Sequence, residues 1–246
     1  MSDLEEIKVE VLGTGGALSE LPTSFLVEEN LLIDAGYPII QKIIKNKKIE
    51  NIKFLFLTHL HMDHVSGIEL LVYYLQFSNT NIKIFAGNDF MSFYKTLKCS
   101  TNVDGSYYQP FEFVDISYAM DKSNHFQFEC EEVYLTAVKA FHMNGSVECF
   151  SFTVQKGFDN SFAKIIFSGD TDNPINTTEG LLENMNGFLF HDMGWTGLEG
   201  FKHIHKAHPT EKEVYDSIGY TNRIFGIHTD AELKYFYKAK ARIYKF

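Results

Sequence analysis

Seven consecutive residues constrain this chain more than any others: Thr58-His59-Leu60-His61-Met62-Asp63-His64. They follow the nearly continuous apolar run Ile52–Leu57, which predicts a buried strand. Imidazole and carboxylate groups are ligands for zinc and similar divalent ions, and a strand-to-helix turn can aim several of them at one point. The alternating His59 and His61 can serve one ion, while Asp63 and His64 can serve a second. A chance surface cluster is the alternative, and with only 10 histidines in the chain it is disfavoured.

The remaining pattern predicts two groups of strands with helices between them. Helical spacing or capping residues predict helices over Pro38–Lys48, Gly67–Phe77 and Thr210–Ile218. Besides Ile52–Leu57, strands are predicted over Ile7–Leu12, Phe25–Val27, Leu31–Ile33, Ile82–Phe85, Phe111–Ser117, Phe126–Cys130, Val133–Ala140, Cys149–Val154, Ala163–Phe167, Gly187–Phe190 and Arg223–Ile227. This order favours an α/β fold, an αββα sandwich of two sheets between outer helices. We expect a single domain over residues 1–246, because no long linker or repeat interrupts the pattern, and a core rich in the 23 phenylalanines.

The amino-acid composition limits which molecules the protein can bind. The formal net charge is −10, from 22 basic and 32 acidic side chains, which disfavours binding to long nucleic acids. A small phosphorylated substrate stays compatible with it, because bound metal ions reverse the local potential. Cys99, Cys130 and Cys149 have no metal-type spacing and indicate free thiols in a reducing compartment. We see no secretory leader and no membrane-spanning run, so we expect a cytoplasmic protein of a bacterium or a phage-infected host.

The His-x-His-x-Asp-His segment after an apolar strand resembles the motif of the metallo-β-lactamase superfamily. Its other ligands have counterparts here at His142, Asp170 and His228, each after a predicted strand. The resemblance implies the metallo-β-lactamase αββα sandwich and two divalent ions, Zn²⁺ or else Mn²⁺, that lower the pKa of a shared water. The residue roles follow from the same resemblance: one ion is held by His59, His61 and His142, the other by Asp63, His64 and His228, and Asp170 bridges them. Asp34 either orients a ligand imidazole or is an ordinary turn carboxylate.

Two further segments resemble the ribonuclease Z branch of that superfamily. Phe190-His191-Asp192 is similar to its strand-end His-Glu, and Ala207-His208-Pro209-Thr210 is similar to its His-Ser-Thr. The resemblance implies that His208 protonates the leaving oxygen and that Asp192 orients it, with Asp63 as the third catalytic residue. Alternatively, His208 caps a helix and Asp192 is a solvated acid.

Two departures from that branch bear on the substrate. Between His142 and Asp170 there is room only for two strands and a turn, so the tRNA-gripping arm of those enzymes has no counterpart, and their basic loop after the first strand is missing. A compact enzyme of this kind resembles the phage anti-Pycsar enzymes and their bacterial relatives. That resemblance implies hydrolysis of cyclic mononucleotides such as cCMP, cUMP, cAMP and cGMP, and with it evasion of cyclic-nucleotide antiphage signalling. Kinship with ribonuclease Z-like proteins also implies that the chain forms a homodimer. We assign substrate contacts to Tyr107, Tyr108 and Ser168, although the Gly105–Tyr108 segment could equally be a packed loop.

Three other functions stay open. A ribonuclease Z-type tRNA 3′ endonuclease would share every catalytic residue. A lactonase or β-lactamase-like hydrolase would lack the pair His208 and Asp192. A nucleotide-binding protein without turnover is disfavoured by the presence of all seven ligand positions.

Overall fold

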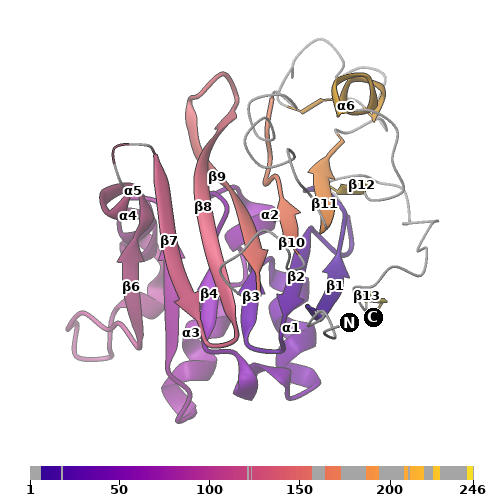
Figure 1. The fold of residues 1–246 in the computed structure, drawn as a ribbon. Coiled ribbons are helices and arrows are strands. Elements are labelled where there is room, and N and C mark those ends of the chain that lie inside the picture. Colours follow the sequence, from indigo (N-terminus) through magenta and orange to yellow (C-terminus); the bar gives the residue numbers. More distant parts are fainter. Residues whose placement is uncertain are drawn as a thin grey trace.

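The computed structural model arranges the strands in two sheets that pack face to face (Figure 1). Among the described residues, the first sheet has seven strands in the order β13-β1-β2-β3-β4-β5-β6, and the second has six in the order β12-β11-β10-β9-β8-β7. The structure describes residues 7–17, 19–120, 122, 124–156, 164–172, 187–193, 208–209, 211–218, 224–227 and 243–245.

The first sheet comes mainly from the N-terminal half of the chain. Its strands are β1 (Val9–Gly13), β2 (Ser24–Val27), β3 (Leu31–Ile33), β4 (Phe54–Phe56), β5 (Ile82–Ala86), β6 (Phe111–Asp115) and β13 (Ile243–Lys245). Both predicted strands are present, and β2 and β3 pair antiparallel as a hairpin with Phe25 opposite Ile33. β3, β4, β5 and β6 then run parallel, so their carboxyl ends meet at one edge of the sheet.

The second sheet is antiparallel from β7 to β10 and parallel from β10 to β12. Its strands are β7 (His125–Cys130), β8 (Val133–His142), β9 (Val147–Gln155), β10 (Lys164–Phe167), β11 (Gly187–Asp192) and β12 (Ile224–Ile227). The long β8–β9 hairpin extends beyond its neighbours (Figure 1). The ends of β8, β10 and β11 therefore carry His142, the 168–172 segment and Asp192 to one side of the sandwich.

Phenylalanine fills the space between the sheets, as predicted. Phe25 of the first sheet lies 4.6 Å from Phe167 and 4.8 Å from Phe190 of the second, measured between ring centroids. Phe56 lies 4.6 Å from Phe152 in the same way. Such offset and tilted ring pairs add to the burial of apolar area, so this aromatic layer fixes how the two sheets face each other.

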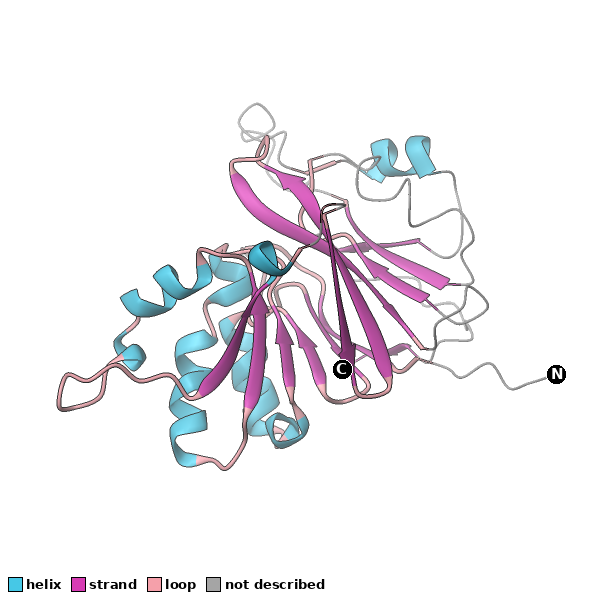
Figure 2. Cartoon of the chain, turned by 60° about the vertical axis from the view of Figure 1, so that its left-hand side comes forward, coloured by secondary structure: helices cyan, strands magenta, loops and turns pink. Residues whose placement is uncertain are grey.

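Helices cover the outer face of each sheet (Figure 2), which confirms the αββα sandwich. α1 (Tyr37–Lys45), α3 (Ile68–Phe77) and α4 (Phe90–Thr96) pack against the first sheet, and α6 (Glu211–Ile218) packs Val214 against Ile166 and Leu189 of the second. The short helices α2 (Met62–Val65), α5 (Ile116–Ala119), η1 (Lys48–Asn51) and η2 (Lys98–Ser100) complete the described elements. No helix in these described parts is long and apolar enough to cross a bilayer.

One predicted strand is shorter than its apolar pattern suggests. The run Phe111–Ser117 leaves the sheet at Asp115, whose carboxylate accepts the backbone N–H of Tyr118 and begins α5. A side-chain cap of this kind favours a helix over further strand pairing. The predicted cap of α6, Thr210, lies outside the described residues.

Candidate metal centre

The His59–His64 segment begins just after β4, at the edge where the parallel strands end. Leu57 extends the pairing by donating its N–H to the carbonyl oxygen of Phe85, and the chain then turns into α2 with His61 as its N-cap. His59 therefore lies in the turn, while Asp63 and His64 lie in the first turn of the helix, and all three side chains are buried.

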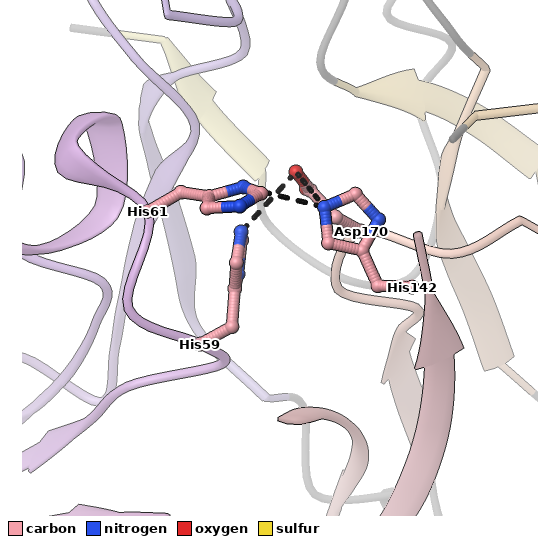
Figure 3. Close-up of side chains that lie close together, drawn as sticks. All are labelled: His59, His61, His142 and Asp170. Atoms are coloured by element: carbon pink, nitrogen blue, oxygen red, sulfur yellow. Dashed lines mark hydrogen bonds and ion pairs between the residues drawn. The ribbon is translucent and has the colours of Figure 1, made fainter. Parts of the chain in front are cut away.

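Three imidazoles and one carboxylate converge above this edge (Figure 3). His61 Nδ1 lies 3.3 Å from Nε2 of His142, which belongs to the opposite sheet. Asp170 Oδ2 lies 3.5 Å from His59 Nε2 and 4.0 Å from His142 Nε2. One ligand atom from each of the four residues lies within 4.8 Å of the other three.

The chemistry of this cluster fits a divalent ion. Two nitrogen ligands at about 2.0–2.1 Å from a tetrahedral zinc ion are about 3.3–3.4 Å apart, which matches the His61–His142 separation. Among the described residues, His59 Nε2 is buried without a hydrogen-bond partner, as expected of an atom that binds a metal. Burial lowers the pKa of His59 well below its usual range and also lowers the pKa values of His61 and His142. The three rings are therefore neutral, which is the form that binds metals.

A second group of ligand atoms lies beside the first. His64 Nε2 is 3.4 Å from Asp63 Oδ2 and 3.6 Å from Asp170 Oδ1. Burial by itself would lower the pKa of His64, but the carboxylates of Asp34 and Asp170 outweigh it and hold that pKa well above its usual range. Asp170 thus points one oxygen at each group, the arrangement that a bridging carboxylate requires.

Asp34 and Thr58 contact the Nδ1 atoms of His64 and His59, on the side of each ring away from the cluster. Asp34 Oδ2 lies 2.7 Å from His64 Nδ1, and its carboxylate also accepts the N–H and the hydroxyl of Thr58 at 2.8 to 3.0 Å. The same Thr58 hydroxyl lies 3.0 Å from His59 Nδ1. With both Nδ1 atoms engaged, the Nε2 atoms of His59 and His64 face the cluster. Of the two possibilities for Asp34, the geometry favours the orienting one, and Thr58 is a supporting residue that the sequence reasoning did not single out.

The backbone of the segment 34–36 packs directly against α2. Ala35 donates its N–H to the carbonyl oxygen of His64 at 2.6 Å and accepts the N–H of Gly67 at 2.8 Å. A Cβ at Gly36 would lie 2.5 Å from the carbonyl oxygen of Asp63, so only glycine permits this approach. This packing sets the direction of the helix that carries Asp63 and His64.

Asp192 and His208 form a pair next to the cluster. His208 Nδ1 lies 2.6 Å from Asp192 Oδ2, and the same oxygen accepts the N–H of Thr171 at 3.0 Å. Asp192 is fully buried, whereas His208 is partly exposed and its ring lies 5.1 Å from that of His142. Ligand atoms of Asp170, Asp192 and His208 lie within 4.8 Å of one another. The pair thus shares its edge of the sandwich with the His/Asp cluster.

Other residues singled out from the sequence lie elsewhere. Ser168 is fully buried, and its hydroxyl accepts the N–H of Asp192 and donates to the carbonyl oxygen of Gly169, so it supports Asp192. Tyr107 and Tyr108 precede β6, at the end of the parallel strands opposite to the His59–His64 segment. The structure therefore does not bring them to the cluster. His228 lies outside the described residues.

A sequence model described as Anti-Pycsar protein Apyc1 matches residues 7–232, nearly the whole chain. The chain belongs to this family. A stretch of 79 residues is also 35% identical to ribonuclease Z of Haloferax volcanii, and that match covers 30% of this chain and only 25% of the relative.

Solved structures show the same fold. YhfI of Bacillus subtilis, a metallo-β-lactamase fold protein, superposes with a TM-score of 0.64 at 16% identity over 92% of this chain and 87% of its own. The short form of human tRNase Z superposes with a TM-score of 0.62 at 20% identity, over 90% of this chain and 92% of its own. The metallo-β-lactamase fold is therefore confirmed. Together, the family, the fold and the His/Asp cluster support a metal-dependent hydrolase that binds a divalent ion.

Proposed function

We propose that the protein is a dinuclear-metal phosphodiesterase that opens cyclic mononucleotides such as cCMP, cUMP, cAMP and cGMP. The observation that carries the proposal is the His208–Asp192 pair, joined at 2.6 Å and placed beside the metal ligand Asp170. A histidine oriented by a buried carboxylate suits protonation of a poor leaving group. A sugar alkoxide is such a group, whereas hydrolysis at carbon needs this pair less.

The proposed ligand sets follow the two groups of atoms. His59, His61 and His142 would hold one ion, Asp63, His64 and His228 the other, and Asp170 would bridge them. When bound, two Zn²⁺ or Mn²⁺ ions would neutralise phosphate charge and lower the pKa of water. We favour Zn²⁺, because imidazole nitrogen dominates the described ligand set.

The chain's own groups supply the proton. Water attacks phosphorus in line, a new P–O bond forms, and the P–O bond to the departing sugar oxygen breaks. His208 gives that oxygen its proton from Nε2, because Nδ1 faces Asp192. Asp63, which lies beside His64, would accept the proton of the water. The product is a ring-opened nucleoside monophosphate.

A small substrate fits the chain better than tRNA. The net charge of −10 opposes the phosphate contacts on which long nucleic acids depend. Between His142 and Asp170 the described residues form little more than β9 and β10, which leaves an RNA-gripping arm without a counterpart among them. A ribonuclease Z-type activity stays the second candidate because it would use the same groups. By kinship we also propose a homodimer in the cytoplasm.

The test is turnover of a panel of 3′,5′-cyclic mononucleotides by Zn²⁺- or Mn²⁺-loaded protein, beside a tRNA precursor and a lactone. We expect opening of the cyclic nucleotides and its loss in Asp63→Ala. His208→Ala should lower the rate about 10²- to 10⁴-fold with metal content unchanged, and the matched control is His125→Ala, which truncates an exposed histidine of β7.

Each other outcome selects another function. Cleavage of the tRNA precursor with inert cyclic nucleotides would show a ribonuclease, and a fast lactone reaction would show a carbon-centred hydrolase. Tight binding of a cyclic nucleotide without turnover would show a nucleotide-binding protein. Unchanged turnover in metal-loaded His208→Ala would refute the proton-donor role.

A further inference from the structure

Asp172 is a carboxylate next to the cluster to which the proposed reaction gives no role. It follows the Asp170–Thr171 pair, and its backbone N–H donates to the carbonyl oxygen of Phe141 at 2.8 Å. Its Oδ2 accepts the backbone N–H of Asn144 at 2.6 Å. These two bonds attach Asp172 to the chain on both sides of His142.

The second carboxylate oxygen faces His142 itself. Asp172 Oδ1 lies 3.8 Å from His142 Nδ1, on the side of the ring away from the cluster. This oxygen is buried and makes no hydrogen bond to the residues that the structure describes, although a buried carboxylate oxygen is costly to leave unpaired. The side chain of His142 is fully buried and that of Asp172 is 13% exposed, so water screens their attraction little.

The turn after His142 needs such an anchor. Met143 and Asn144 both have left-handed backbone angles, with φ of +50° and +56°, and Gly145 follows at +76°. This conformation costs a non-glycine residue roughly 1–2 kcal/mol, so hydrogen bonds are needed to keep the turn in it. The hydrogen bond from Asn144 N–H to Asp172 restrains the turn where the chain leaves His142.

The other ligand imidazoles of the cluster show the same kind of support. His59 Nδ1 faces the hydroxyl of Thr58, and His64 Nδ1 faces the carboxylate of Asp34. For His59 the oxygen behind the ring favours the tautomer in which Nε2 carries a lone pair toward the cluster, and for His64 it orients the ring with Nε2 toward the cluster. Asp172 occupies the equivalent place behind His142.

We infer that Asp172 is a positioning residue for His142: its carboxylate, tied to the Asn144 backbone, holds that imidazole with Nε2 toward the metal. The inference rests on the proposed metal centre. It assigns to Asp172 a role in metal affinity, separate from the chemistry of His208.

The experiment measures Zn²⁺ affinity by competition with a chelator, together with the visible absorption of Co²⁺-loaded protein and the unfolding midpoint of metal-free protein. Asp172→Ala should weaken binding of one ion about 10- to 100-fold and alter the Co²⁺ spectrum. Asp172→Asn keeps one acceptor oxygen and should lose less. The matched control is Asn144→Gly, which keeps the donating N–H, relieves the left-handed strain and should bind metal normally.

The double variant Asp172→Ala with Asn144→Gly separates the two possible roles. If Asp172 acts on His142, the weakened affinity persists in the double variant. Recovery of normal affinity there would show that Asp172 only restrains the turn, and unchanged affinity in Asp172→Ala would equally overturn the inference. Failure of the wild-type chain to bind two ions would instead refute the metal centre itself.

Discussion

Two chemically identical substitutions, Thr58→Val and Thr153→Val, should change stability in opposite directions. Both hydroxyls are buried, but they differ in their partners. The Thr58 hydroxyl lies at 2.9 and 3.0 Å from the Asp34 oxygens and at 3.0 Å from His59 Nδ1. The Thr153 hydroxyl, on β9, has no hydrogen-bond partner in the described part of the chain. Comparing the two variants therefore shows how much a buried hydroxyl with partners, and one without, contributes to the free energy of unfolding.

The magnitudes follow from those partners. Thr58→Val removes a hydrogen bond to a charged acceptor, which costs about 1.5–3 kcal/mol. It also leaves the buried Nδ1 of His59 without its hydrogen-bond partner Thr58, which costs about 1–3 kcal/mol more. We therefore expect the free energy of unfolding to fall by about 3–5 kcal/mol, and the midpoint by roughly 10 °C for a chain of this length. Thr153→Val removes an unpaired polar group and should raise the stability by about 1 kcal/mol.

Thermal and urea unfolding of both variants, after treatment with a chelator, would measure these changes without the contribution of bound metal. Zn²⁺ binding by the same proteins gives a second readout, because Thr58→Val should also weaken affinity about 10- to 100-fold, whereas Thr153→Val should not. Equal stability changes in the two variants would refute the idea that Thr58 joins Asp34 to His59.

Two further predictions concern the residues around Asp170 and the thiols. Gly169→Ala should destabilise the protein and weaken metal binding, because φ there is +63° and a Cβ would lie 2.6 Å from the carbonyl oxygen of Phe150. The control Gly105→Ala, at φ +82° in open space, should lower the free energy of unfolding by only about 1–2 kcal/mol and leave metal binding unchanged. Unfolding curves and chelator competition measure both effects. Burial raises the pKa of Cys99 to about 11 and that of Cys130 to about 12, and it raises the pKa of Cys149 well above its usual value. The thiols therefore stay protonated at pH 8. Mass spectrometry should find the native protein unmodified by iodoacetamide and the urea-unfolded protein modified at all three cysteines. Rapid labelling of the native protein would contradict the burial of these thiols.

The sequence predicted the local parts of the molecule well. Apolar runs placed most strands within a few residues of their observed bounds, and the helical spacing of Ile39, Ile40 and Ile43 placed α1. These features depend on neighbours along the chain. The position of the His59–His64 segment was also predictable, because it follows a buried strand and turns into α2 within a few residues.

Other elements depended on contacts that no local pattern records. The end of β6 was decided by the Asp115 side chain, which accepts the N–H of Tyr118, and α4 has only seven residues, which is too short for a helical period to stand out. Tyr107 and Tyr108 illustrate the same limit, because only the parallel direction of β5 and β6 places them at the end of the sheet away from the cluster.

The sequence by itself thus determined which residue types could bind a metal and which strands they follow. Only the tertiary structure decided that His142 at the end of β8 meets His61 at the start of α2, with 3.3 Å between their nitrogens, and that Asp34 and Thr58 lie behind His59 and His64. The physical reason is that a strand's own residues set where its side chains point, whereas the aromatic layer around Phe25 and Phe167 sets how the two sheets face each other.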